Sequence, residues 1–141
     1  MKAIIIGAGG HARVVYDILR HDQNVTVESF VDNTRRGSDE DIMGVPVTGD
    51  HSVIPELVDD GVELFVVAVG DNDIRRDHYE HLREQGLSPV NAVHPSAEIT
   101  ATATIGTGSV FASSSGISTN AVVGDNVIVN TDHWSNTKRR Y

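Results

Sequence analysis

A glycine-rich turn near residue 10 is the first segment whose composition suits a charged ligand. Its sequence, Gly-Ala-Gly-Gly-His-Ala, spans residues 7–12 and separates a short apolar run from a stretch with helical periodicity. Small residues at such a turn let backbone amides and a helix N-terminus approach a phosphate, as in the dinucleotide-binding fingerprint. The same turn is also typical of an ordinary strand–helix connection, so it predicts a candidate phosphate loop but no particular ligand.

Two further apolar runs also end in polar residues. Asp32 and Asn33 close the second run, where a carboxylate is well placed for a ribose or a base. Asp71 and Asn72 follow the most apolar run of the chain and are equally typical of a helix N-cap. Arg75 comes one turn into the helix predicted there, where a charge would ordinarily be solvated.

Composition argues against several kinds of site. The 141 residues include no cysteine, 20 acidic and 11 basic side chains, and the net charge is −9. That charge has the wrong sign for a surface that neutralises nucleic-acid phosphates, although Trp134 lies close to the basic run 138–140. No apolar run approaches the ~20 residues of a membrane helix, so we expect a cytoplasmic protein without membrane insertion.

One predicted helix carries a weak candidate for a metal site. His78 and His81 lie there with Asp77 and Glu84. Two histidines at i and i+3 do not form the i, i+4 pair that metal-binding helices use. We therefore expect a solvated helix face and no metal.

Residues 1–92 alternate between strand and helix patterns. Apolar runs predict strands at 3–6, 25–31, 45–47 (an edge strand, because of its proline) and 64–69. Helical spacing predicts helices over 12–21 and around 53–58, and a third that ends at Gly86 and presents the stripe Ile74, His78 and Leu82. This alternation predicts βαβ units, and therefore a small Rossmann-like domain with a parallel sheet over 1–92.

From Val93 the sequence repeats every six residues. Large apolar residues occupy seven successive repeat positions: Val93, Ile99, Ile105, Phe111, Ile117, Val123 and Val129. A second, mostly small column follows four residues after each of the first six. This periodicity predicts a three-sided β-helix of about two coils over 93–131, with large side chains inside and small ones at the corners. Residues 132–141 depart from the pattern as a divergent tail.

The two halves together resemble a known family of enzymes. The likeness is carried by the turn at 7–12, Val-Asp-Asn at 31–33, Val-Gly-Asp-Asn-Asp-Ile-Arg at 69–75, His-Pro-Ser-Ala at 94–97 and the Ile-Gly repeats. In this order they resemble the sugar O-/N-acyltransferases, which include sialic-acid O-acetyltransferases and bacterial UDP-amino-sugar N-acetyltransferases. The resemblance implies an α/β fold, in which a small Rossmann-like parallel-sheet domain precedes a short left-handed parallel β-helix. It also implies acetyl-CoA as co-substrate, a nucleotide-linked sugar as partner, and a homotrimer.

The resemblance assigns roles residue by residue. Contacts to the diphosphate-sugar fall to Gly9, Gly10 and His11; contacts to the nucleoside fall to Asp32 and Asn33; Gly70 lines the same pocket; and supporting positions fall to Asp71, Asn72, Arg75 and Asn130. For His11 we favour function over packing, because the adjacent glycines leave its ring exposed near the helix N-terminus.

The catalytic position departs from the family pattern. A general base, commonly histidine, must take the proton of the attacking amine or hydroxyl. The resemblance places that histidine near position 137, which is Thr137, and the nearest histidine, His133, comes about four residues early. We therefore assign no catalytic residue and expect an acetyl-CoA-dependent sugar acyltransferase that is shortened relative to its family and impaired in transfer. The alternatives are a non-catalytic nucleotide-sugar-binding or trimer-forming remnant and a small NAD-binding domain.

Overall fold

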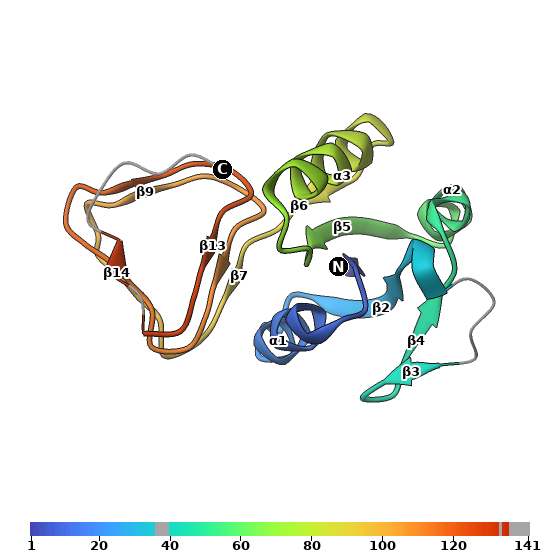
Figure 1. The fold of residues 1–141 in the computed structure, drawn as a ribbon, viewed down its shortest axis with the longest axis horizontal. Helices are drawn as coiled ribbons and strands as arrows, with labels where there is room; N and C mark the ends of the chain where they lie inside the picture. Colours follow the sequence, from blue (N-terminus) through green and yellow to red (C-terminus); the bar gives the residue numbers. More distant parts are fainter. Residues whose placement is uncertain (36–39, 133, 136–141) are drawn as a thin grey trace.

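A three-sided prism of short strands lies beside a sheet that carries helices on both faces (Figure 1). The structure is a computed structural model, and it describes residues 1–35, 40–132 and 134–135. The sheet and its helices come first in the chain, and the prism begins with β7 (Ala92–Val93). Within the described ranges, no helix is both long and apolar enough to cross a bilayer.

The sheet of the described residues has six strands in the order β3-β4-β2-β1-β5-β6. Their bounds are β1 (Lys2–Ile6), β2 (Thr26–Val31), β3 (Asp41–Ile42), β4 (Val45–Thr48), β5 (Val62–Val67) and β6 (Ser88–Pro89). Pairing is parallel except between β3 and β4. The central strand β1 is buried from Ala3 to Ile6, as expected for a strand covered on both faces. The predicted parallel sheet is confirmed.

The strand predicted at 45–47 is present as β4, but its predicted edge position is wrong. A two-residue turn at Met43 and Gly44, both with positive φ (50° and 85°), folds β3 back onto β4 as a hairpin. Such turns match the twist of an antiparallel pair, but they usually contain Asn-Gly or Asp-Gly, so this Met-Gly turn gives little signal in the sequence. β3 therefore takes the outer position, and Pro46 pairs across the hairpin with Asp41.

Helices cover both faces of the sheet. α1 (Gly10–Leu19) packs on one face, and α2 (Ile54–Asp59) and α3 (Asn72–Glu84) pack on the other (Figure 1). Two 3-10 turns, η1 (Asn33–Arg35) and η2 (His51–Val53), follow β2 and precede α2. The strand–turn–helix order places each helix N-terminus near the carboxyl end of the preceding strand, which is the edge where ligands bind in open α/β sheets.

The stripe predicted on α3 is only partly confirmed, because Leu82 is buried and His78 is half-buried but Ile74 is not. Its buried side chains are Arg75, Tyr79 and Leu82, whereas Ile74 is 48% exposed. α3 packs against the sheet and also against a corner of the prism, and that corner presents polar groups. Periodicity of apolar residues therefore does not mark the face that is buried.

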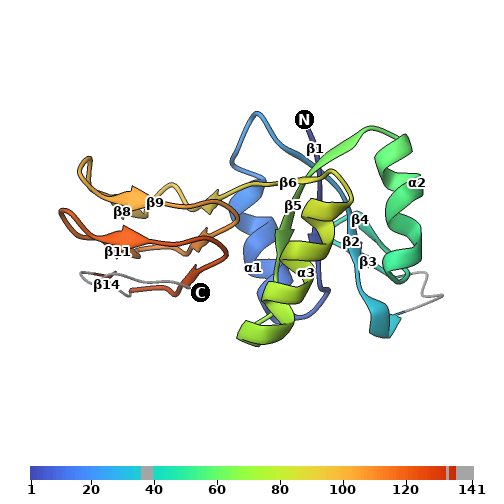
Figure 2. The same ribbon diagram turned by 90° about the horizontal axis from the view of Figure 1, so that it is seen from above.

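The prism consists of short parallel strands stacked in coils of 18 residues. Its strands are β7, β8 (Glu98–Ile99), β9 (Thr104–Ile105), β10 (Val110–Phe111), β11 (Gly116–Ile117), β12 (Val122–Val123), β13 (Ile128–Val129) and β14 (Trp134–Ser135). They form the stacks β13-β10-β7, β14-β11-β8 and β12-β9, one for each side of the prism. Figure 2 shows β8, β11 and β14 one above another. The parallel ladder extends past Thr131, because β14 pairs with β11.

The six-residue column of large side chains forms the inside of the prism. Phe111, Ile117, Val123 and Val129 are at most 1% exposed and make one hydrophobic cluster. Val93, the first member of the column, is 40% exposed because it lies in the first strand of the first coil. The inward direction of the column, on which the β-helix prediction depends, is confirmed.

Candidate functional site

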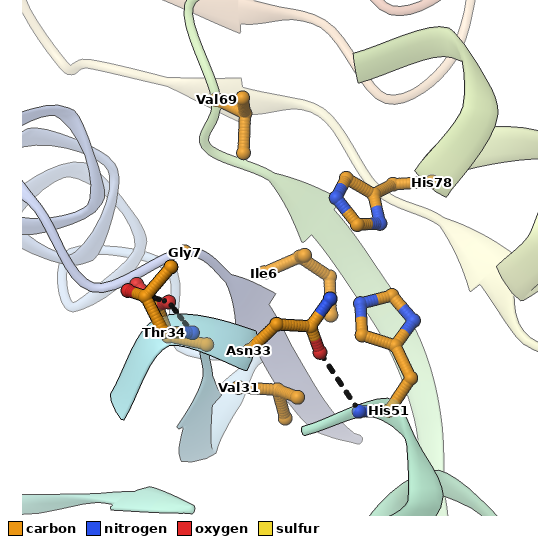
Figure 3. A pocket seen from close by; sticks show the side chains of 9 residues that line it. Ile6, Gly7, Val31, Asn33, Thr34, His51, Val69 and His78 are labelled. Atoms are coloured by element: carbon orange, nitrogen blue, oxygen red, sulfur yellow. Dashed lines mark hydrogen bonds between the residues drawn. The ribbon is translucent and has the colours of Figure 1, made fainter. Parts of the chain in front are cut away.

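A pocket of about 200 Å³ opens at the carboxyl ends of β1, β2 and β5. It is lined by Ile6, Gly7, Val31, Asp32, Asn33, Thr34, His51, Val69 and His78 (Figure 3). After β1 the chain adds β2 and β4 on one side and β5 on the other. The pocket therefore lies at the point where the strand order reverses, which is the general position of ligand sites in this class of fold.

Glycine at position 7 is required by the backbone. Its φ is +109°, and an added Cβ would lie 2.9 Å from the carbonyl oxygen of Ala68. In contrast, a Cβ at Gly9, Gly10 or Gly70 would meet no atom within 4 Å. The last three glycines are not among the residues that line the pocket, but each leaves open space at its Cβ position.

The N-terminus of α1 faces this open turn. Gly9 is its N-cap residue and provides no side-chain hydrogen bond. The first amides of a helix have no partner within the helix and attract anions. The geometry therefore suits a phosphate, and the contact assigned from the glycine-rich motif stays a prediction.

His11 lies in the first turn of α1. Its Nε2 atom is buried and has no hydrogen-bond partner among the described residues. Burial, and secondarily the nearby Arg75 guanidinium, lowers the pKa of His11 below its ordinary value. The ring is therefore neutral near pH 7 and has a ring nitrogen free to hydrogen-bond a ligand.

Asp32 and Asn33 both line the pocket, but they make different contacts. One carboxylate oxygen of Asp32 accepts hydrogen bonds from the backbone nitrogen of Thr34 (2.8 Å) and from its hydroxyl (2.7 Å). The side-chain oxygen of Asn33 accepts a hydrogen bond from the backbone nitrogen of His51 (3.1 Å; Figure 3). Asp32 therefore shapes the turn after β2, and Asn33 ties that turn to η2.

The sequence analysis did not identify a histidine wall on one side of the pocket. The ring centroids of His51 and His78, which line the pocket, are 4.6 Å apart; the ring centroid of His81, which does not line it, is 5.7 Å from that of His51. Burial, then the neighbouring imidazoles, lowers the pKa of His51 to about 4. Burial and His81 also lower the pKa of His78, against the opposing effect of Asp77 and Asp32. His51 lies in a 3-10 turn far from α3 in the sequence, and no local pattern signals this meeting.

A separate cluster has the composition of a metal site. Asp17, His21 and His94 bring ligand atoms within 4.8 Å of one another. However, His94 Nδ1 accepts hydrogen bonds from the backbone nitrogen (3.0 Å) and the hydroxyl (2.8 Å) of Ser96. This arrangement puts the ring proton on Nε2 and leaves that atom unable to ligate a metal.

The supporting residues predicted after β5 hold the structure together. Asp71 caps α3 by accepting hydrogen bonds from the backbone nitrogens of Asp73 and Ile74 (both 3.0 Å). Arg75 is 4% exposed, so the expectation of a solvated charge is wrong. Its Nη2 donates to Asn72 Oδ1 (2.8 Å). None of these three residues lines the pocket.

Arg75 and Tyr79 join α3 to the prism. Arg75 Nη1 donates to the carbonyl oxygens of Val69 (3.2 Å) and Gly70 (3.1 Å), and Nε donates to that of Asn126 (2.9 Å). The Tyr79 hydroxyl lies 2.9 Å from that of Thr107. These contacts fix the loop beside the pocket against the first two coils of the β-helix.

Of the three residues predicted near the end of the β-helix, the structure describes only Asn130. Asn130 is exposed, follows β13 and does not line the pocket. His133 and Thr137 lie outside the described residues.

A Rossmann-like domain with a ligand pocket at its strand ends, joined to a hexapeptide β-helix, defines a sugar-acyltransferase type of architecture. Residues 2–82 match the family described as PglD N-terminal domain, and the chain belongs to that family. The resemblance found in the sequence and the predicted fold class are both confirmed by this match and by the relatives below.

One curated relative is UDP-N-acetylbacillosamine N-acetyltransferase of Bacillus subtilis (strain 168). It is 30% identical over 112 residues, which cover 76% of this chain and 49% of the relative. The chain thus spans about half the length of the curated relative it matches.

Two solved structures are similar to most of this chain. A mutant of perosamine N-acetyltransferase from Caulobacter crescentus, in complex with CoA and GDP-perosamine, has a TM-score of 0.86 and 36% identity, over 92% of this chain and 60% of that one. The acetyltransferase domain of PglB from Neisseria gonorrhoeae FA1090, in complex with acetyl coenzyme A, has a TM-score of 0.81 and 32% identity, over 96% of this chain and 64% of that one.

Proposed function

We propose that this chain binds a nucleotide-linked sugar at the carboxyl edge of its sheet and serves acetyl transfer from acetyl-CoA to that sugar. The observation that carries the proposal is the pocket, which Gly7 lines, together with the turn that follows it, where Gly9 and Gly10 leave open space and His11 Nε2 has no hydrogen-bond partner among the described residues. Relatives with the same two-part architecture are named for acetyl transfer to nucleotide-linked sugars, and two were solved with CoA or acetyl-CoA.

The pocket and the glycine-rich turn that follows Gly7 suit different parts of such a ligand. The amides at the start of α1 suit the diphosphate, and the Asp32–Asn33 turn suits the nucleoside. A neutral His11 suits a sugar hydroxyl or amine, because its free nitrogen then meets a polar group rather than remaining buried without a partner.

In the proposed reaction an amine or hydroxyl of the sugar attacks the thioester carbonyl of acetyl-CoA. The new C–N or C–O bond forms as the C–S bond breaks, CoA leaves as its thiol, and a base takes the proton of the attacking group. The resemblance places that base near Thr137, where the sequence has no histidine. We therefore propose reduced transfer by this chain and assign no catalytic residue.

Assembly and location follow from the same proposal. We propose a homotrimer in which acetyl-CoA binds between neighbouring β-helices, as the resemblance implies. We also propose a cytoplasmic enzyme, because nucleotide-linked sugars and acetyl-CoA are cytoplasmic metabolites.

The second candidate is nucleotide-sugar binding without acetyl transfer. It is favoured by the threonine at position 137. Both candidates share the pocket and differ in turnover, so one set of measurements separates them.

The test combines calorimetry with a thiol-release assay. UDP-N-acetylglucosamine, GDP-mannose, acetyl-CoA and NAD are titrated into the full chain, and CoA release is followed with a UDP-linked 4-amino sugar and with GDP-perosamine as acceptors. Binding of a nucleotide sugar with CoA release supports transfer, and binding without release supports the second candidate. Binding of NAD alone would refute both in favour of a small NAD-binding domain.

A further inference from the structure

We propose that His51, His78 and His81 form a binding site for a divalent transition-metal ion of the kind that imidazoles coordinate, such as Zn²⁺ or Ni²⁺. The site joins two elements, because His51 lies in η2 and the other two lie one turn apart on α3. Metal binding here is independent of the proposed acetyl transfer, and its test uses no nucleotide and no acetyl-CoA.

The third imidazole changes the argument that the sequence alone allows. Two histidines at i and i+3 do not make the usual metal-binding pair of a helix. Ligands at i and i+3 do share a metal where another element supplies further ligands, as in the Glu-x-x-His motifs of di-metal helix bundles. His51 comes from such an element, and Figure 3 shows its ring next to that of His78.

The spacing of the rings suits one shared ion. A zinc–nitrogen distance of about 2.0–2.1 Å and tetrahedral angles place the ring centroids of two coordinating imidazoles about 5 Å apart. The centroid of the His51 ring lies 4.6 Å from that of His78 and 5.7 Å from that of His81. Both distances are close to the value that coordination needs, so the fold has already brought the three ligands together.

The rings must turn to converge on one ion. The His51 ring is tilted by 31° to that of His78 and by 34° to that of His81, so the rings lie nearly face to face. Their nitrogens are not all within 4.8 Å of one another. However, His51 and His78 are only half-buried and His81 is exposed. Side chains of this kind change rotamer rapidly, so binding requires rotation about side-chain bonds.

Two of the three ligands already have the protonation state that a metal needs. A coordinating histidine must be neutral. Burial, and then the neighbouring imidazoles of α3, lowers the pKa of His51 to about 4. Burial and His81 also lower the pKa of His78. Neither ring therefore has to release a proton when a metal binds near pH 7.5.

Neighbouring groups support a cation at this position. The side-chain nitrogen of Gln85 lies 2.7 Å from His81 Nε2. If this amide is turned over, its oxygen accepts the Nε2 proton and leaves Nδ1 to coordinate, which is the arrangement that metal-bound histidines commonly have. Asp77 and Asp32 act on His78 through their negative charge, which also favours a bound cation.

The ligand set selects the class of metal. Imidazole nitrogens suit Zn²⁺, Cu²⁺ and Ni²⁺, whereas Mg²⁺ and Ca²⁺ prefer sets of oxygen ligands. We therefore expect Zn²⁺ and Ni²⁺ to bind in the presence of excess Mg²⁺.

The test titrates ZnCl₂ and NiCl₂ into the untagged full chain by calorimetry at about pH 7.5 in a buffer that does not bind metals. The decisive variants are His51→Phe and His78→Phe, which keep a ring but remove its nitrogens. His21→Phe is the matched control, because His21 is an exposed histidine of the separate cluster with Asp17 and His94. Melting curves without metal show that each variant is folded, and electron paramagnetic resonance of bound Cu²⁺ shows whether nitrogens coordinate it in the unaltered chain.

We expect one ion per chain, a loss of affinity of at least tenfold in each decisive variant, and an unchanged affinity in His21→Phe. Excess Zn²⁺ should also raise the Tm of the unaltered chain by about 5 °C, and not that of His51→Phe. Absence of binding, a loss of less than tenfold in His51→Phe, or an equal loss in His21→Phe would overturn the site. Each of these results would leave the proposed acetyl transfer untouched.

Discussion

The hydrogen bonds of Arg75, which join α3 to the loop after β5 and to the prism, should contribute measurably to the stability of this fold. Arg75 is 4% exposed and donates to four acceptors, the carbonyl oxygens of Val69, Gly70 and Asn126 and the side chain of Asn72. Hydrogen bonds to a charged group contribute about 1.5–3 kcal/mol each, but removal of the charge also relieves its desolvation. We therefore expect Arg75→Met to lower the free energy of unfolding by about 3 kcal/mol, which corresponds to a fall in Tm of roughly 6–12 °C.

Urea unfolding and thermal melts at one protein concentration measure this loss. The matched control is Arg76→Met, which removes the same charge one residue away at an exposed position, where substitutions usually change stability by less than about 0.5 kcal/mol. Arg75→Lys keeps the charge but cannot reach four acceptors, and we expect an intermediate loss. Equal melting temperatures for the Arg75→Met and Arg76→Met variants would show that the hydrogen bonds of Arg75 add nothing to stability, and would refute the reasoning.

Three further predictions test the fold and the pocket. Gly7→Ala should destabilise by about 1–3 kcal/mol in urea unfolding because of its φ of +109°, whereas Gly9→Ala, with open space around its Cβ, should be close to neutral. Ile117→Ala should cost about 2–5 kcal/mol by the same measurement, since that side chain is fully buried inside the prism; a loss under 0.5 kcal/mol would contradict the inward column. The fold lowers the pKa of His51 from 6.5 to about 4. Between pH 7 and pH 5 this histidine therefore takes up a proton in the unfolded chain but not in the folded one, so the free energy of unfolding falls as the pH drops. The double variant His51→Gln/His78→Gln should lose less stability than the unaltered chain over that range, and parallel pH curves would exclude this contribution.

The features predicted well are those that repeat or follow the chain locally. The six-residue column of large side chains predicts the prism directly, because each repeat forms one side and its large side chain must point inward. The cap at Asp71 was recognisable as one of two possibilities, since its partners lie two and three residues on. The glycine-rich turn was also recognised, although the backbone requirement falls on Gly7 rather than on the glycines that leave the site open.

The features missed depend on partners distant in the sequence. Arg75 looks like an exposed charge until the carbonyl of Asn126, 51 residues later, comes into reach. Nothing in the sequence around His51 predicts its contact with His78. The two rings meet because α2, which follows the turn of His51, packs on the same face of the sheet as α3. Periodicity measures the apolarity of one segment, so it cannot report a buried face whose partners are polar.

One helix connects the pocket to the β-helix. His78 lies between Arg75 and Tyr79 along α3, and it faces the pocket while its neighbours face the prism. The contacts of Arg75 and Tyr79 with the prism therefore fix the position of His78 at the pocket. A helix held at one turn by hydrogen bonds and at the next by Tyr79 against Gly108, where an added Cβ would lie 2.8 Å from the Tyr79 ring, has little freedom to slide. A sugar bound in the pocket would thus be held at a set distance from the coils, and such fixed positioning is what transfer between two bound groups requires.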